Sequence, residues 1–351
     1  MLTFIFAVNI ILNSSFYSSN NNFDFSGMDQ FWKIVKTLES NREPSKSDWN
    51  QLFSTPGYKI LTSGEFNKQF FIDNFRLVFK PSNRKKLEES LKNKKYLHHL
   101  NHYIKVRDNK NLIKDQQKLL ERNNFNNIAI DRTIEFLPQN NVYEYPPVSF
   151  LIFESNGRGS SPIIVDVAAS IEWDFISFLS HEFHHWYRNK QLQFSYTDLA
   201  FEDQAIIKVF SMIEAEGIAD MVDKKDWFTK PNSAISEYAR GFIRDVGKTS
   251  AVIVSMDEVL NQIYKDPKQK KNLAKRLYYL LPQKGHTTGY FMASLILEKF
   301  SKSKLVMCVG NPFEFILLYN KAAKMSAGRY PSFSDESIKL ISEFSSKYII
   351  N

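Results

Sequence analysis

The stretch SHEFHHWYRNK, residues 180–190, carries the strongest structural and functional signal in this chain. It holds three of the seven histidines within five positions, with a glutamate among them. His181 and His185 follow the spacing H-E-x-x-H. On a helix such positions lie about 40° apart on one face, so that two imidazoles can hold one metal ion. Glu182 stands beside that face, where a general base could take a proton from a zinc-bound water. The stretch therefore predicts a zinc site on a helix.

The surrounding sequence favours a buried helix, running from about Glu172 to Lys190. Apolar side chains flank the histidines, as expected for an active-site helix (Phe175, Phe178, Leu179, Phe183 and Trp186). A purely structural helix with satisfied histidines stays open as the alternative. His184 lies off the predicted metal face, so we expect it to support a ligand from behind or to face solvent. We expect Arg188 to pair with a nearby carboxylate or with the C-terminal dipole of the helix.

A third zinc ligand is expected on a second helix, because catalytic zinc usually takes three protein ligands and leaves one position for water. The stretch SMIEAEGIADMVDKK, residues 211–225, offers Glu216 as this ligand, with Asp220 one turn further on. Asp220 could accept the free N–H of a ligand histidine and fix its tautomer. Gly217 and Ala219 would let two helices approach closely. Glu214 is the competing ligand, and a solvated acidic face is the alternative without metal.

Peptide hydrolysis also needs a group that stabilises the oxyanion of the tetrahedral intermediate. The stretch PQKGHTTGYFMASLIL, residues 282–297, is predicted to open a helix, in which His286 and Tyr290 share a face. Either side chain could donate a hydrogen bond, and structural hydrogen bonding or capping is the alternative for both.

His98 and His102 form a rival pair with the spacing i, i+4. No glutamate stands next to them, so we expect helix-surface or core histidines with at most adventitious metal binding.

The order of elements predicts an α+β fold in which helices dominate. Residues 28–126 show mostly helical periodicity. The segments VSFLIFE (148–154) and PIIVDVA (162–168) predict two strands joined by a glycine turn, and the chain after Pro231 is predicted to be helical to its end. A strand within 163–167 could pair with an extended peptide, although an ordinary internal hairpin is equally compatible with the sequence.

These motifs resemble those of gluzincin-type zinc metallopeptidases, which have H-E-x-x-H followed by E-x-x-x-D on a second helix. The longer strings HEFHHWYR, EAEGIADMVD and GHTTGYFMA, with the preceding hairpin, are similar to an uncharacterised bacterial family of zinc-dependent peptidases. The similarity covers roughly residues 28–350. It implies a thermolysin-like core with an edge strand above the active-site helix and a glutamate on a second helix. It implies no particular substrate.

Composition limits the other classes of function. The net charge of +8 comes from scattered lysines and arginines without interleaved stacking aromatics, so we expect no nucleic-acid partner. Cys308 is the only cysteine, which excludes an intramolecular disulfide and a cysteine-rich zinc site. A hydrophobic content of 43% at 351 residues is typical of a globular protein with a large core.

The first 23 residues contain no charged side chain, and the apolar run 2–12 has the length of a signal-peptide core but not of a membrane span. We therefore expect a signal peptide over residues 1–23, although no lysine or arginine precedes the run. A helical region would follow over 24–140 and a peptidase-like region over 141–351, both in one compact unit. The protein would then act outside the cytoplasm, in the periplasm or secreted. The alternative is a cytoplasmic protein with a folded N-terminal segment.

The combined prediction is a zinc-dependent metallopeptidase with one Zn²⁺ per chain. His181, His185 and Glu216 would hold zinc, Asp220 would orient a ligand histidine, and Glu182 would take the proton from zinc-bound water. His286 or Tyr290 would assist at the oxyanion. The substrate would be a peptide or protein. A zinc hydrolase with a non-peptide substrate and a non-catalytic zinc-containing binding protein remain alternatives.

Overall fold

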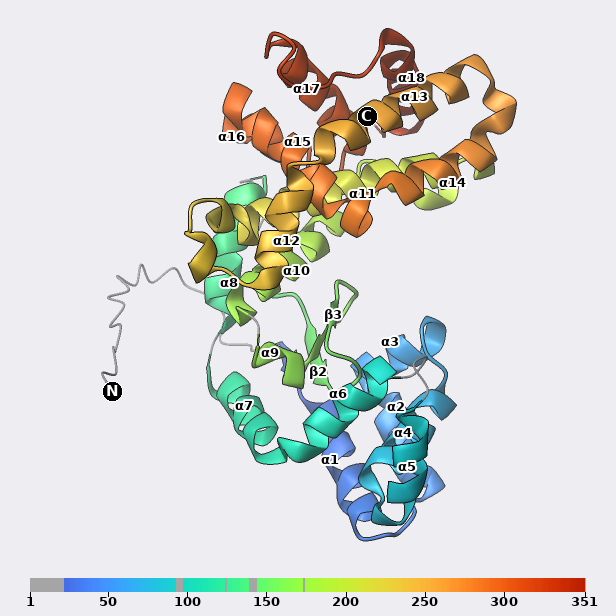
Figure 1. Cartoon of the computed structure of the whole chain (residues 1–351), viewed down its shortest axis with the longest axis vertical. Helices are drawn as coiled ribbons and strands as arrows, with labels where there is room; N and C mark the ends of the chain where they lie inside the picture. The colour runs from blue at the N-terminus through green and yellow to red at the C-terminus, as the bar shows by residue number, and fades with distance from the viewer. Residues whose placement is uncertain (1–21, 93–96, 124, 139–143, 173, 351) are drawn as a thin grey trace.

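Helices form most of the protein, and four short strands form one small sheet (Figure 1). The computed structural model describes residues 22–92, 97–123, 125–138, 144–172 and 174–350. The helices are α1 (Ser26–Glu39), α2 (Lys46–Ser54), α3 (Pro56–Gly64), α4 (Lys68–Phe79), α5 (Arg84–Ser90), α6 (Leu97–Asp108), α7 (Lys110–Arg122), α8 (Phe125–Thr133), α9 (Val167–Ser170), α10 (Phe175–Lys190), α11 (Phe201–Asp223), α12 (Glu237–Val246), α13 (Thr249–Lys265), α14 (Lys270–Leu280), α15 (His286–Lys299), α16 (Lys302–Val306), α17 (Pro312–Lys324) and α18 (Asp335–Tyr348). The predicted α+β class with helices dominant is confirmed.

The N-terminal helices follow local sequence signals. In α1 the predicted apolar face is buried (Phe31, Ile34, Val35 and Leu38). Ser45 caps α2: its side chain accepts from the Asp48 N–H, and the Asp48 carboxylate accepts from the Ser45 N–H. This reciprocal pair satisfies donors that every helix start leaves free. Figure 1 shows these blue helices on one side of the sheet and the yellow-to-red C-terminal helices on the other.

The sheet corrects the predicted hairpin. Its strands are β1 (Phe23–Asp24), β2 (Val148–Leu151), β3 (Gly157–Arg158) and β4 (Ile163–Asp166), in the order β1-β2-β4-β3. The prediction that 148–154 and 162–168 form a hairpin is wrong, because β2 and β4 run parallel. After β2 the chain forms the edge strand β3. It then reverses direction and forms β4, which lies between β2 and β3. Of the glycines between the two predicted strands, Gly157 is part of β3 and Gly159 lies in the turn between β3 and β4.

The position of β4 also changes the predicted edge strand. β4 is paired on both sides, with β2 and with β3, so the segment 163–167 has no free edge that could receive a peptide. The edge strands are β1 and β3, and β3 runs antiparallel to β4. Arg158 on β3 pairs with Glu65 and Glu154. These pairs tie the edge of the sheet to the end of α3.

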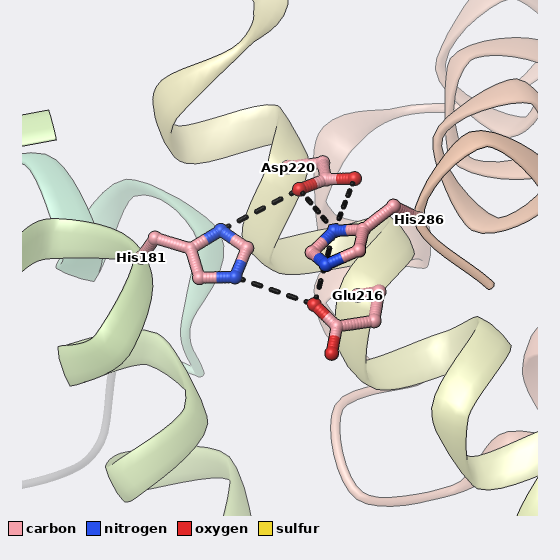
Figure 2. A group of neighbouring side chains, drawn as sticks. All are labelled: His181, Glu216, Asp220 and His286. Atoms are coloured by element: carbon pink, nitrogen blue, oxygen red, sulfur yellow. Dashed lines mark hydrogen bonds and ion pairs between the residues drawn. The ribbon is translucent and has the colours of Figure 1, made fainter. Parts of the chain in front are cut away.

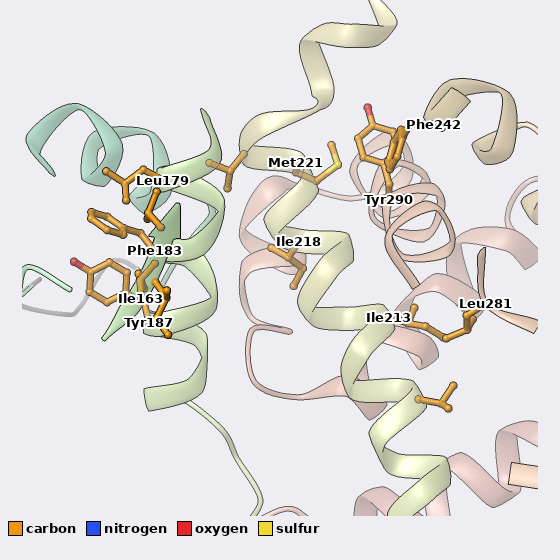
Figure 3. Packing of buried hydrophobic residues seen from close by; sticks show 14 of the residues in the cluster. Ile163, Leu179, Phe183, Tyr187, Ile213, Ile218, Met221, Phe242, Leu281 and Tyr290 are labelled. Atoms are coloured by element: carbon orange, nitrogen blue, oxygen red, sulfur yellow. The ribbon is translucent and has the colours of Figure 1, made fainter. Parts of the chain in front are cut away.

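Helix α10 packs against the sheet and α8 with its apolar face. The rings of Phe150 and Phe175 lie 6.1 Å apart, and the Thr133 hydroxyl donates to the Ser180 carbonyl at 2.9 Å. Figure 3 shows Leu179 and Phe183 on the side of α10 that points away from α11. The opposite side of α10, which carries His181, consequently faces α11.

Helices α11 and α15 touch through their backbones. A Cβ atom on Gly217 would lie 2.5 Å from the backbone carbonyl of Gly289, and a Cβ on Gly289 would lie 2.2 Å from the carbonyl oxygen of Ile213. Only glycine at both positions permits this approach. The predicted role of Gly217 in close helix packing is confirmed, and its partner is α15. The contact fixes the start of α15, and thus His286, beside α11.

The predicted signal peptide lies almost entirely outside the described residues, so it stays a prediction. Phe23, the last residue of that predicted segment, pairs with Val148 as part of β1. Within the described ranges, no helix combines the length and the apolar character needed to cross a bilayer.

Replacing Gly217 by alanine should destabilise the protein, because the added methyl group meets backbone atoms that cannot rotate away. Overpacking of this kind costs about 1–3 kcal/mol of the free energy of unfolding. Thermal or denaturant unfolding followed by circular dichroism measures the loss. Gly64→Ala is the matched control, because a Cβ there meets no atom within 4 Å. Equal stability of the two variants would contradict the assigned helix contact.

Candidate zinc site

Two helices bring the predicted ligands together. On α10 the Nε2 atoms of His181 and His185 lie 2.9 Å apart. On α11 the Oε2 atom of Glu216 lies 3.3 Å from the His181 Nε2 and 3.2 Å from the His185 Nε2. Figure 2 shows His181 reaching from α10 toward Glu216 on α11. Three potential ligand atoms from two helices thus form a small triangle.

This triangle fits a zinc ion. A tetrahedral ion with bonds of about 2.0–2.1 Å separates its ligand atoms by roughly 3.3–3.4 Å. The observed separations of 2.9–3.3 Å are close to this value. Glu216 Oε2 is buried and makes no hydrogen bond among the described residues, although imidazole nitrogens of His181 and His185 lie 3.3 and 3.2 Å from it. A buried carboxylate oxygen without a donor is costly, and a cation bound there would satisfy it. Two histidines and one glutamate are also a common ligand set of catalytic zinc.

The charges of the site are consistent with cation binding. Burial alone would raise the pKa of the Glu216 carboxyl, but the imidazoles of His185 and His181 lower it well below its ordinary value. Burial and Lys224 lower the pKa of His181, whereas Asp223 and Glu216 raise it, and the net direction is well above the ordinary value. Glu216 is therefore ionised, and its negative charge stabilises a positive charge placed next to it.

Glu214, the competing ligand, is engaged elsewhere. It is fully buried, and the Arg188 Nε donates to its Oε2 at 2.9 Å. The Gly310 N–H donates to its Oε1 at 2.9 Å. Residues two apart on a helix point in nearly opposite directions, which separates Glu214 from Glu216. The expected pairing of Arg188 with a carboxylate is thus present, and both oxygens of Glu214 are already occupied.

His286 reaches the site from the first turn of α15. The preceding turn η7 (Pro282–Gly285) holds three consecutive left-handed residues, Gln283, Lys284 and Gly285, with φ values of 48°, 56° and 101°. Such backbone is costly for the two non-glycine residues, and it is found where a side chain must be placed accurately. The His286 Nδ1 lies 3.0 and 3.1 Å from the two oxygens of Asp220 and 3.2 Å from Glu216 Oε2.

Two residues of the site were not identified from the sequence. The Asp223 Oδ1 lies 3.2 Å from the Nδ1 of His181, closer than Asp220 Oδ1 at 3.5 Å. The Lys224 Nζ lies between the two aspartates, 2.6 Å from Asp220 Oδ1 and 2.8 Å from Asp223 Oδ2. The signal was present: Glu216, Asp220 and Asp223 follow the spacing i, i+4, i+7 and share one helix face.

Glu182 lies under the turn between β3 and β4. It is half-buried, and its Oε2 would lie 2.6 Å from a Cβ built on Gly159. The same Cβ would lie 3.6 Å from atoms of His185. Gly159, immediately after the edge strand, therefore covers Glu182 and His185, and its missing side chain leaves room for the carboxylate.

The remaining predicted residues lie away from the triangle. His184 is fully buried, not solvent-facing, and its Nε2 donates to the Phe136 carbonyl at 3.1 Å. Burial lowers the pKa of His184 to about 3, so this imidazole is neutral. Tyr290 is buried against Phe228 and Phe242, with ring centroids at 4.6 and 5.6 Å. Burial raises the pKa of the Tyr290 phenol to about 12.

Of the two rival histidines, His102 has a structural role and His98 is exposed. His102 is buried, and its Nε2 lies 2.9 Å from Asp166 Oδ2. Asp166 also accepts from the N–H groups of Phe153 and Ala169, which ties the end of β4 to α9. His98 stacks edge-on against His99, not against His102. Among the described residues, a group of four that could hold a metal ion is His181, Glu216, Asp220 and His286, which shares His181 and Glu216 with the triangle.

A family model described as "Putative zinc dependent peptidase (DUF5700)" matches residues 49–328. The chain belongs to this family. The match spans most of the N-terminal helices and the whole of α10, α11 and α15, and the family description indicates zinc dependence. No curated protein and no solved structure matches the chain. The thermolysin-like core therefore stays a prediction for this member of the zinc peptidase family.

The two glutamates of α11 should respond differently to substitution. Glu216→Gln should abolish tight zinc binding while leaving the fold intact, because the site loses its anionic ligand. Glu214→Gln should retain the zinc ligands but lower the free energy of unfolding by about 3–5 kcal/mol, since it leaves the buried Arg188 charge unpaired. Zinc content by atomic emission and urea unfolding measure the two effects. Zinc loss confined to Glu214→Gln would reverse the assignment.

Gly159→Ala should displace the Glu182 carboxylate without removing a zinc ligand. The added methyl group overlaps Glu182 Oε2, which can rotate away because it is the end of a flexible side chain. We expect normal zinc content and folding with a reduced turnover of any hydrolysed substrate. Zinc analysis beside a peptide cleavage assay tests this, and Gly64→Ala is again the control. Unchanged turnover would show that Gly159 does not determine the position of Glu182.

Proposed function

We propose that this protein is a zinc-dependent peptidase in which His181, His185 and Glu216 hold the metal and Glu182 acts as the general base. The observation that carries the proposal is the triangle of two histidine nitrogens and the buried Glu216 oxygen, which makes no hydrogen bond among the described residues. Membership of the zinc peptidase family supports the metal and the reaction class. The intact Glu182 beside the triangle supports catalysis, since a structural metal site has no use for that carboxylate.

Each side chain of the site has a separate role in the proposed hydrolysis. Zinc in this site supplies a Lewis acid that acidifies water and polarises a carbonyl oxygen. Glu182 takes one proton from the attacking water while the water oxygen bonds to the carbonyl carbon. Glu182 then passes that proton to the nitrogen as the C–N bond breaks, which leaves an amine and a carboxylic acid, and the acid releases the second proton of the water to become a carboxylate. Asp220 lies against the Nδ1 of His286, and His286 would donate a hydrogen bond to the oxyanion. Tyr290 contacts aromatic rings instead, so His286 is the better of the two predicted donors.

A further proposal concerns location. The uncharged, apolar first 23 residues support export by a signal peptide and activity outside the cytoplasm. Determination of the N-terminus of the protein from its native cells by mass spectrometry tests this. A terminus near residues 18–22 is expected, because β1 begins at Phe23. An intact N-terminal segment on cytoplasmic protein would overturn the proposal.

Glu182→Gln should retain zinc but lose activity, whereas His181→Ala should lose both. Removal of a general base typically costs about 10²–10⁴-fold in rate, and removal of a ligand empties the site. Zinc content and cleavage rate are measured on the same preparations. Glu202→Gln serves as the matched control, because this glutamate is exposed at the start of α11. Full turnover by zinc-loaded Glu182→Gln would remove the base from the proposal.

The reaction class itself is tested with a mixed peptide library. The zinc-loaded protein, the Glu182→Gln variant and a chelator-treated sample are incubated with the library, and products are identified by mass spectrometry. Cuts that vanish in both controls would support a zinc peptidase, and the cut positions would define its specificity. Absence of cuts from protein with one bound zinc would favour a zinc hydrolase with another substrate or a zinc-containing binding protein.

A further inference from the structure

The zinc triangle is supported from behind by a row of charged groups on α11. Asp220 and Asp223 lie one and two turns beyond Glu216, and Lys224 follows directly. Asp220 is fully buried, and Lys224 is 5% exposed. A buried cluster of two carboxylates and one ammonium is expensive unless each member is paired. The pairing of each oxygen therefore shows what each aspartate does.

Asp223 is the nearer partner of the ligand histidine. His181 directs its Nε2 toward Glu216 and His185, which leaves its Nδ1 to carry the proton. That Nδ1 lies 3.2 Å from Asp223 Oδ1, within hydrogen-bond range, and 3.5 Å from Asp220 Oδ1, beyond the usual range. A carboxylate behind a ligand imidazole fixes its tautomer and raises its affinity for the metal.

Asp220 is committed to a different imidazole. Both of its oxygens approach the His286 Nδ1, at 3.0 and 3.1 Å. Figure 2 shows Asp220 above the His286 ring, with dashed lines from both oxygens to one ring nitrogen. The spacing E-x-x-x-D predicted that Asp220 would accept the N–H of a zinc-ligand histidine. In this chain Asp223, three residues further along the helix, is the nearer acceptor for His181.

Lys224 joins the two aspartates. Its Nζ donates to Asp220 Oδ1 at 2.6 Å and to Asp223 Oδ2 at 2.8 Å, so that Asp223 Oδ1 remains available for His181. The ammonium also lies 5.6 Å from the Trp227 ring centroid and 5.9 Å from that of Phe242. These rings enclose the ammonium, and cation–π attraction stabilises it further.

We propose that the two aspartates have separate tasks, with Asp223 positioning the zinc ligand His181, Asp220 positioning His286, and Lys224 fixing both carboxylates in place. This inference deepens the proposed function and rests on the zinc site. All three act through other side chains, so they are positioning residues. Loss of Asp223 should reduce zinc affinity, whereas loss of Asp220 should leave zinc affinity intact and impair the step that uses His286.

The test compares Asp223→Asn with Asp220→Asn. Each variant leaves one aspartate and Lys224, so that the two have equal charge and equal volume. In an asparagine one carboxylate oxygen is replaced by an NH2 group, which donates, so the side chain loses its charge and can no longer accept at both positions as the aspartate does. Zinc dissociation constants are measured by competition with a chromophoric chelator. We expect about 10–100-fold weaker zinc binding in Asp223→Asn and nearly unchanged binding in Asp220→Asn.

Cobalt substitution provides a readout that a general loss of stability would not change. The visible spectrum of bound Co²⁺ reports on its ligands, so Asp223→Asn should shift it and Asp220→Asn should not. If Asp223→Asn fails to fold, Asp223→Ser, which removes the charge and shortens the side chain, replaces it. Equal zinc affinity and equal cobalt spectra in both variants, or weaker binding only in Asp220→Asn, would overturn the division of tasks. These measurements need no substrate, so they remain decisive in a protein that cleaves no peptide.

Discussion

The backbone contact between α11 and α15 is the constraint on which the site depends. Gly217 and Gly289 allow the two helices to touch, and any side chain at either position would overlap main-chain atoms. His286 stands one turn before Gly289, and Glu216 stands next to Gly217. The contact therefore places an imidazole from α15 against the carboxylate of α11. Helix α10 adds its two histidines from the other side, with its apolar residues turned toward the sheet and α8.

Helix α11 consequently makes different contacts on each of its faces. One face meets α15 through glycine, and a second carries Glu216, Asp220 and Asp223 toward the histidines. A third buries Glu214 against Arg188 and the Gly310 backbone. This explains why the helix has two glutamates two residues apart, both inside the protein, with unrelated partners. From Val209 to Asp223 no residue of the helix is exposed, which is unusual for a segment with four acidic residues.

Local signals in the sequence predicted much of this arrangement. The i, i+4 spacing of His181 and His185 depends on residues within about one turn, so a single sequence displays it. The class of fold followed from the periodicity of the helices. Glu216 was favoured over Glu214 because small residues and an aspartate follow it, and the structure places Glu216 at the histidines.

Features that depend on distant parts of the chain were not predictable in the same way. The order β2-β4-β3 depends on which strand the chain leaves at the edge, and the apolar runs 148–154 and 162–168 fit a hairpin and a parallel pair equally well. The preference of His181 for Asp223 over Asp220 depends on the crossing of α10 and α11, which no spacing within α11 reveals. The contact of Gly217 with Gly289 on α15 likewise depends on residues far apart in the chain, so the sequence did not indicate it.

The location of the metal tests the account most directly. A crystal of the zinc-loaded protein, measured with X-rays on both sides of the zinc absorption edge, gives an anomalous difference map that contains zinc alone. The account predicts one peak bonded to the His181 Nε2, the His185 Nε2 and a Glu216 carboxylate oxygen at about 2.0–2.2 Å. A peak bonded to Asp220 and His286 in place of His185, or no peak near α10, would contradict it.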